Sequence, residues 1–399
     1  MKLPPGPIAA ITQRGDAMAA LLVRWAEINS GSANQAGLKR MADALVDEFA
    51  RAFPAAQVER IPLGSGQNSL SPYALSIRLR PGARRQVLLS GHYDTVYDAD
   101  HAFQTCTRIS PNLLRGPGVA DMKGGIVVLL EALRAFECLQ SDPACAQPDP
   151  LGWQVLLTPD EETGSVLSEA LLMETAKRHE LALVFEPARP NGNLVRARMG
   201  TGIFTATCRG RAAHAGRDPQ AGRNAIVALA EFLVEADAAA KSVEGALLNI
   251  GAIRGGGTVN IVPDFAAADL NLRVDGATAE TELWSALNRA AFRINQREGY
   301  RLEFGGRMNR PPKAVTPADE KLFVAYRDCA AGLGLQVDWQ DVAGGSDGNF
   351  LSAKGLPCLD GIGPIGDHLH SSEESVQLDS LVSRAQVAAV LLDRYSRGR

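Results

Sequence analysis

The sequence VLLSGHYD at residues 87–94 decides the fold class of this chain. Its apolar first half predicts a buried strand, and the strand ends in His92 and Asp94. Because positions two apart on a strand face the same side, both side chains are expected in one pocket at the carboxyl end of the strand, where α/β proteins bind ligands. A metal-bound imidazole usually has its second nitrogen held by a carboxylate. The pair is therefore compatible with a metal ligand and its orienting group, or with a solvated polar strand end.

Around this strand, predicted strands alternate with predicted helices, which is typical of an α/β sheet covered on both faces. The strands are expected at 73–79, 86–93, 153–158, 181–185, 336–342 and 357–362. The helices are expected at 9–27, 34–53, 124–139, 165–179, 318–333 and 380–397.

The pattern changes after Glu186. A strand-rich stretch, a helix, two strands, a helix and a strand follow at 194–209, 224–239, 246–253, 265–274, 279–298 and 301–304. This β-α-β-β-α-β order indicates a ferredoxin-like domain. We therefore expect a catalytic domain over 1–195 and 310–399, with a second domain inserted at 196–309.

The composition excludes several classes of protein. The chain has 399 residues, a formal net charge of −4 and only 6 histidines, so a nucleic-acid binder with a dominant basic surface is excluded. No apolar run is long enough for a membrane span. The prolines of the first seven residues interrupt any apolar signal core, which predicts a cytoplasmic protein. The six cysteines form no CxxC pair and are expected to be reduced, mostly buried thiols.

Acidic residues stand at the ends of further predicted strands. Asp121, in GPGVADMKGG at 116–125, precedes a helix and is either its N-cap or a ligand. The segment DEETGS at 160–165 follows a buried strand, and its adjacent carboxylates Glu161 and Glu162 can diverge, one to a metal and one to a water.

Glu186 repeats this arrangement after the next strand, and GDHLHSSEE at 366–374 adds His368 and His370, of which only one need be a ligand. Two histidines, three carboxylates and a spare glutamate are typical of a two-metal hydrolytic site.

These motifs together resemble the co-catalytic zinc metallopeptidases that include carboxypeptidase G, aminoacylase, acetylornithine deacetylase and succinyl-diaminopimelate desuccinylase. The carboxypeptidase G type is the most similar branch. The matching segments come in the family's order across nearly the whole chain: SGHYDTV at 90–96, 116–125, 160–165, Glu186-Pro187, and His370 with Glu374. The resemblance implies a zinc-exopeptidase-like mixed sheet flanked by helices, with an inserted ferredoxin-like lid and dimerisation domain.

The resemblance also implies the ligands of two divalent ions, zinc first, with cobalt or manganese as alternatives. Asp121 bridges the two ions. His92 and Glu186 complete one ion, and Glu162 and His370 complete the other.

Further roles follow from the same resemblance. Glu161 is the general base that takes a proton from the attacking water, and Asp94 orients His92. His370 matches better than His368, because it keeps the following glutamate at the expected offset.

The inserted domain matches through GRAAHAG at 210–216, whose His214 reaches the neighbouring subunit's site in family dimers and stabilises the oxyanion. Substrate contacts are implied for Asn260, Arg273, Arg310, Gly345 and Ser346. One departure concerns 193–200, where the carboxypeptidase G type has a lysine; Arg196 or Arg198 replaces it, or the substrate lacks a glutamate side chain.

The expected function is hydrolysis of the amide bond of an N-acyl amino acid or small peptide with a free carboxylate, by a homodimer that binds neither nucleic acid nor membranes. An aminoacylase or deacetylase acting on a small N-acyl amino acid is the alternative, and a non-catalytic metal-binding protein of the same fold is a remote one. A dinucleotide-dependent redox enzyme is excluded, because the run Gly255–Gly257 does not lead from a strand into a helix.

Overall fold

The computed structural model describes residues 6–64, 72–143, 147 and 149–398. Within these residues the chain divides into two compact units. The first comprises residues up to Arg196 together with Val315–Val342 and Ser346–Arg399, and the second comprises Ala197–Ala314 and Ala343–Gly345.

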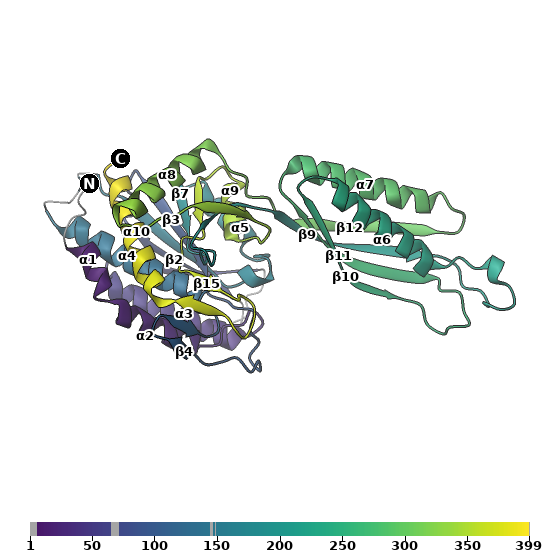
Figure 1. The fold of residues 1–399 in the computed structure, drawn as a ribbon, viewed down its shortest axis with the longest axis horizontal. Helices are drawn as coiled ribbons and strands as arrows, with labels where there is room; N and C mark the ends of the chain where they lie inside the picture. The colour runs from purple at the N-terminus through teal and green to yellow at the C-terminus, as the bar shows by residue number, and fades with distance from the viewer. Residues whose placement is uncertain (1–5, 65–71, 144–146, 148, 399) are drawn as a thin grey trace. The chain divides into compact units, whose positions relative to one another are not determined.

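A sheet of eight strands forms the centre of the first unit (Figure 1). Its order across the sheet is β1 (Gln57–Pro62), β2 (Tyr73–Leu79), β6 (Gly152–Thr158), β3 (Gln86–His92), β7 (Leu181–Val184), β14 (Cys358–Asp360), β8 (Leu194–Arg198) and β13 (Trp339–Val342). The four neighbours β6, β3, β7 and β14 are parallel, whereas β1, β2 and β8 pair antiparallel. The predicted mixed sheet is therefore confirmed.

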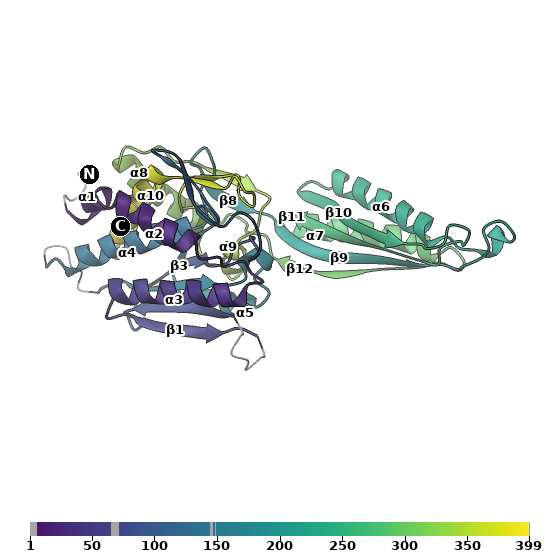
Figure 2. The same cartoon turned by 90° about the horizontal axis from the view of Figure 1, so that it is seen from below.

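Helices cover both faces of this sheet (Figure 2). One face packs against α1 (Pro7–Thr12), α2 (Gly15–Ala26), α3 (Gln35–Ala52), α4 (Lys123–Ser141), α8 (Pro317–Gly332) and α10 (Leu378–Ser396). The opposite face packs against α5 (Glu169–Ala176) and α9 (Asp347–Ser352). Nearly all side chains of β3, β6 and β7 are buried, because helices cover both faces of the sheet. This explains the near-continuous apolar runs of these strands in the sequence.

The second unit has a four-stranded antiparallel sheet in the order β10 (Ala246–Gly255), β11 (Phe265–Val274), β9 (Gly200–Arg209), β12 (Arg301–Arg310). The short helix η2 (Pro219–Ala221), α6 (Ala225–Ser242) and α7 (Ala277–Asn295) complete it, and α6 and α7 pack on the sheet over a separate apolar core. Chain order and strand order are those of a ferredoxin-like domain, as expected.

Several elements differ from the prediction. The helix expected at 9–27 is broken at Gln13–Arg14, where the Arg14 guanidinium binds both carboxylate oxygens of Glu131. The helix expected at 165–179 starts only at Glu169, because Asp160 accepts the N–H groups of Leu167 and Ser168 and holds the preceding residues in a loop.

Other elements were not predicted. The edge strand β1 was missed because most of its side chains are exposed and it carries no apolar run. The helix α9 and a small third sheet were also missed; the sheet has the order β15 (Gly366–Asp367), β16 (Ser375–Gln377), β5 (Leu113–Arg115), β4 (Thr107–Ser110). These strands are two to four residues long, too short to show a period.

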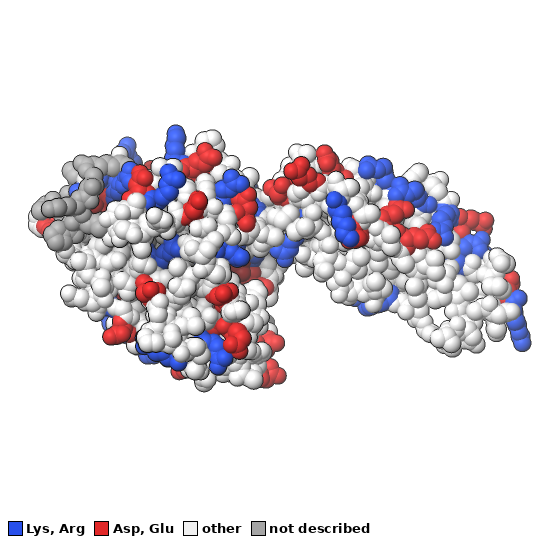
Figure 3. Space-filling view, in the orientation of Figure 1, with Lys and Arg blue, Asp and Glu red and all other residues white. Residues whose placement is uncertain are grey.

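The remaining expectations concern the thiols and the surface. Cys106, Cys138, Cys208, Cys329 and Cys358 are free, and the last three are buried, whereas Cys145 lies outside the described residues. None of the helices in the described ranges has the length and apolarity needed to cross a bilayer. Basic and acidic side chains are interspersed on the face seen in Figure 3.

Candidate active site

Three parallel strands deliver the candidate site to one edge of the central sheet. His92 is the last residue of β3, the short helix η1 (Glu161–Thr163) follows β6, and Glu186 follows β7. Strand β3 lies between β6 and β7 and runs parallel to both. The three carboxyl ends therefore lie side by side.

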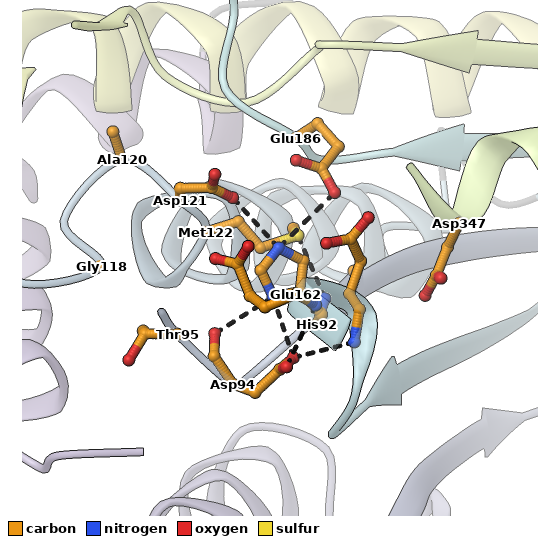
Figure 4. Close-up of polar contacts among 12 residues, drawn as sticks. His92, Asp94, Thr95, Gly118, Ala120, Asp121, Met122, Glu162, Glu186 and Asp347 are labelled. Carbon is orange, nitrogen blue, oxygen red and sulfur yellow. Dashed lines mark hydrogen bonds and ion pairs between the residues drawn. The ribbon is translucent and has the colours of Figure 1, made fainter. Parts of the chain in front are cut away.

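Asp121 contacts both histidines of the cluster, and Figure 4 shows its carboxylate directed toward His92. One of its carboxylate oxygens is 3.1 Å from Nε2 of His92, and the other is 3.3 Å from Nε2 of His370. Glu186 Oε1 lies 3.6 Å from the same nitrogen of His92, and Glu162 Oε2 lies 3.1 Å from the same nitrogen of His370. The structure thus brings together all five side chains that the sequence predicted as ligands.

This arrangement fits divalent metal ions. Tetrahedral zinc with bonds of about 2.0–2.1 Å places neighbouring ligand atoms about 3.3 Å apart, close to the separations around Asp121. His92, Asp121 and Glu162 each offer an atom within 4.8 Å of the others. Because the two oxygens of Asp121 face different imidazoles, the geometry suits a carboxylate shared by two ions.

The pKa values in the cluster are shifted by mutual contacts. Hydrogen bonds to Asp121 and Glu162 raise the pKa of His370 to about 11. Burial, reinforced by the negative charge of Asp121, raises the pKa of Glu162 to about 8. Burial opposes ionisation of Asp121 too, but hydrogen bonds from His370 and His92 hold its pKa below the ordinary value. Strongly perturbed acids and imidazoles in one place are typical of functional sites.

Asp94 joins His92 to the loop that carries the two glutamates. Its Oδ1 lies 3.2 Å from Nδ1 of His92 and accepts the N–H of Glu161 at 3.2 Å. Its Oδ2 accepts the N–H of Glu162 at 3.2 Å and the hydroxyl of Ser32 at 2.7 Å. The sequence predicted the contact with His92, whereas the contacts with η1 and Ser32 emerge only from the fold.

The two histidines of the loop 366–374 have different surroundings. His370 faces Asp121 and Glu162, as described above. Nε2 of His368 lies 3.8 Å from Asp367, and its side chain is 63% exposed. The geometry therefore favours His370 as the ligand, in agreement with the spacing of the motif.

In the second unit, His214 and Asn260 lie on adjoining loops. Nδ1 of His214 accepts the N–H groups of Gly216 and Arg217 at 3.1 and 3.2 Å. With Nδ1 accepting, the neutral ring carries its proton on Nε2, which is then a donor. The carbonyl of Asn260 accepts the N–H of Ala215 at 2.9 Å and keeps the two loops together.

The other predicted substrate residues of this unit gather near residues 343–345. Arg273, on β11, donates to the carbonyl of Ala343 at 2.6 Å. Arg310 is buried and lies so close to Gly345 that a Cβ at this glycine would come within 3.0 Å of the guanidinium.

The side chain of Ser346, in the first unit, is held by hydrogen bonds inside that unit. Its hydroxyl accepts the N–H of Gly348 at 3.1 Å, which caps α9, and donates to Asp360 at 2.7 Å.

The proposed substitutes for the family lysine are held by internal contacts. Arg196 binds both carboxylate oxygens of Asp341, and Arg198 donates to the carbonyl of Gly344 at 3.1 Å. The fully buried Lys313 pairs with Arg198 through an antiparallel bridge. The sequence did not point to Lys313, because a lysine after two prolines looks like a loop residue until the fold buries it.

Comparison with known sequences identifies the family. Residues 88–394 match the peptidase family M20/M25/M40. Carboxypeptidase G2 of Pseudomonas sp. (strain RS-16) is 26% identical over 323 residues, covering 79% of this chain and 75% of the relative. Succinyl-diaminopimelate desuccinylase of Cereibacter sphaeroides is 26% identical over 334 residues, covering 79% of this chain and 85% of the relative.

Solved structures share the fold. A tripeptidase from Staphylococcus aureus has a TM-score of 0.78 at 18% identity and covers 96% of this chain and 99% of its own. A dinuclear metal-binding peptidase of the M20 family from Bacillus subtilis has a TM-score of 0.71 at 13% identity, with 97% and 99% covered. The predicted resemblance is thereby confirmed: the chain belongs to the peptidase family M20/M25/M40, a family of hydrolytic enzymes.

Proposed function

We propose that this protein hydrolyses the amide bond of an N-acyl amino acid or small peptide with a free carboxylate, with two divalent ions, zinc first. The observation that carries the proposal is the convergence of two histidines and two glutamates around Asp121, with Glu161 next to one of these glutamates in the chain. Family membership supports hydrolysis, and the similarity to carboxypeptidase G2 supports the substrate class.

The ligand roles follow the geometry. His92 and Glu186 would hold one ion, Glu162 and His370 the other, and Asp121 both. Two such ions, when bound, lower the pKa of a water and polarise the carbonyl of the substrate.

Glu161 is proposed as the general base. It is buried, and Asp94 fixes its backbone N–H next to that of Glu162. Its carboxylate takes a proton from the attacking water as the new carbon–oxygen bond forms, and delivers it to the leaving amine as the carbon–nitrogen bond breaks.

The second unit is proposed as a lid through which the chain forms a homodimer in the cytoplasm. The Nε2–H of His214 would donate to the developing oxyanion of the neighbouring subunit's site, where one such donor typically contributes about 2.7–4 kcal/mol. The proposed substrate contacts come from the following residues: Asn260, Arg273, Arg310 and the Gly345–Ser346 backbone.

The test of the base is Glu161→Gln, which keeps the size of the side chain but removes its basicity. We expect this variant to bind as much metal as the wild type and to lose most turnover, as measured by metal analysis and amide hydrolysis. Glu174→Gln, on the exposed surface of α5, is the matched control and should keep full activity. Full activity of Glu161→Gln would contradict the assignment of Glu161 as the general base.

The alternative substrate is a small N-acyl amino acid, which an aminoacylase or deacetylase would take. The observation in its favour is that Arg196 and Arg198, the candidates to bind a glutamate side chain, already contact Asp341 and Gly344. A panel of N-acyl-glutamates, N-succinyl and N-acetyl amino acids and dipeptides separates the two. Preference for N-acyl-glutamates supports the first proposal, and indifference to the glutamate side chain supports the alternative.

A further inference from the structure

We propose that Glu374 is a positioning residue of the metal centre: its buried carboxylate fixes the loop of Asp121 relative to the loop of His370. The inference rests on the proposed function, because it concerns the same ligands. Within the described part of the chain, no contact joins Glu374 to a predicted substrate residue, so its role is exerted through the two loops.

The carboxylate of Glu374 binds one loop through three backbone N–H groups. Its Oε1 accepts the N–H of Ala120 at 2.9 Å and the N–H of Asp121 at 3.0 Å. Its Oε2 accepts the N–H of Gly118 at 3.1 Å. The three donors follow one another along the loop that leads into α4, as the positions of Gly118, Ala120 and Asp121 in Figure 4 show. The peptide N–H of Asp121 itself is therefore held by Glu374.

The same residue belongs to the loop of His370. The hydroxyl of Tyr97 lies 2.7 Å from Oε2 of Glu374 and 2.8 Å from the carbonyl of Ser371, so it joins Glu374 to the residue that follows His370. The N–H of Glu374 donates to the carbonyl of Ser371 at 3.0 Å. These contacts tie the turn that presents His370 to the carboxylate that holds Asp121.

The small third sheet explains how residues so far apart in sequence meet. Strand β16 begins at Ser375, which pairs with Arg115 at the end of β5. Just outside the two strands, the N–H of Gly116 donates to the carbonyl of Glu374 at 3.1 Å. Two short strands thus bring the carboxylate to donors 253 to 256 positions away.

Burial makes this contact consequential. Glu374 is 1% exposed, so loss of its carboxylate leaves buried backbone N–H groups without their acceptor, which is costly. Nε2 of His370 and Oδ2 of Asp121 are 3.3 Å apart, and the ligand distances of a metal site lie within about 0.2 Å of their standard values. A small shift of either loop therefore changes the affinity for the ion that both residues would hold.

The experiment compares metal binding by the full-length wild type, Glu374→Gln and Glu373→Gln. In Glu374→Gln an amide NH₂ replaces one acceptor and faces N–H donors. Glu373 is the matched control because it precedes Glu374, and its side chain is 67% exposed and pairs with the half-buried Arg115. Zn²⁺ and Co²⁺ are titrated as the metal alone, and the visible spectrum of the Co²⁺ form reports the ligand geometry.

We expect Glu374→Gln to weaken the binding of at least one ion about 10- to 100-fold and to change the Co²⁺ spectrum, with a larger loss in kcat than change in KM. Glu373→Gln should match the wild type. If Glu374→Gln does not fold, Tyr97→Phe decides, because it removes one contact to Glu374 and should weaken metal binding to a smaller extent.

The proposal is overturned if folded Glu374→Gln keeps the metal affinity and the Co²⁺ spectrum of the wild type. If only Tyr97→Phe folds, the same result in that variant overturns it. Either outcome leaves the proposed function intact. If the wild type itself binds no metal, the proposed function and the positioning role both fail.

Discussion

At the scale of single residues, the candidate site is built from carboxylates that bind the backbone as well as the predicted ligands next to them. Asp94 contacts His92 on one strand and two N–H groups of η1 after another strand. It therefore sets the position of a predicted ligand together with that of the predicted base. An ionised carboxylate does this well, because both of its oxygens accept only.

The prediction at this scale concerns Asp94→Asn. Its amide replaces an acceptor with a donor, so in either orientation it faces an N–H group of η1, that of Glu161 or that of Glu162. We expect metal affinity or kcat/KM to fall about 10- to 100-fold, as is usual when the partner of a metal-bound histidine is lost. Metal titration and steady-state kinetics measure both. Asp100→Asn, an exposed residue beyond the same strand, is the control, and equal behaviour of the two variants would contradict the role of Asp94.

At the scale of elements, the ends of the helices are held by side chains that also fix distant strands. In α8, Thr316 and Asp319 form a capping box. The second oxygen of Asp319 accepts the N–H of Cys358 at 2.7 Å, at the start of β14. One cap thus begins a helix and aligns a strand of the central sheet.

We predict that Thr316→Ala lowers the free energy of unfolding of the first unit by about 0.5–2 kcal/mol, because the N–H of Asp319 loses its acceptor. Thr316→Ser keeps the hydroxyl and should remain close to the wild type. Urea unfolding followed by circular dichroism compares the two variants. A loss of the same size in both would show that the methyl group, and not the cap, is what matters.

At the scale of the whole molecule, two compact units have separate apolar cores. The core of the first unit packs helices on both faces of the eight-stranded sheet, whereas that of the second packs α6 and α7 on the antiparallel sheet. All five predicted metal ligands belong to the first unit. Metal binding should therefore stabilise one core and not the other.

The prediction at this scale concerns the unfolding transitions of the two units, measured by calorimetry with zinc or with a chelator. Free zinc at 100 times the dissociation constant should stabilise the first unit by about 2.7 kcal/mol for each ion that binds only the folded state. The transition of the second unit should not move. The controls are two single variants, His92→Ala and His370→Ala. Zinc should shift the transition of their first unit less than it does in the wild type. Equal shifts of both transitions in the wild type would contradict the assignment of the site to one unit.

The sequence by itself determined the α/β class, the ferredoxin-like order of the second unit and the family, and the structure and comparisons confirm them. Strand alternation and the common edge of parallel strands pointed to a pocket with His92 and acidic residues. The resemblance to the family then named the full ligand set, Asp121 and the four residues that surround it. Their roles, and those of Glu161, His214 and the substrate contacts, stay predictions.

Only the tertiary structure decided what holds these residues in place. The contacts of Glu374 with Asp121, of Asp94 with η1, and of Arg310 with Gly345 join segments that no local pattern relates. The burial of Lys313 and the pairing of β16 with β5 are likewise long-range. The physical reason is that a period reports which face a side chain takes, whereas the partner on that face depends on how the whole chain packs.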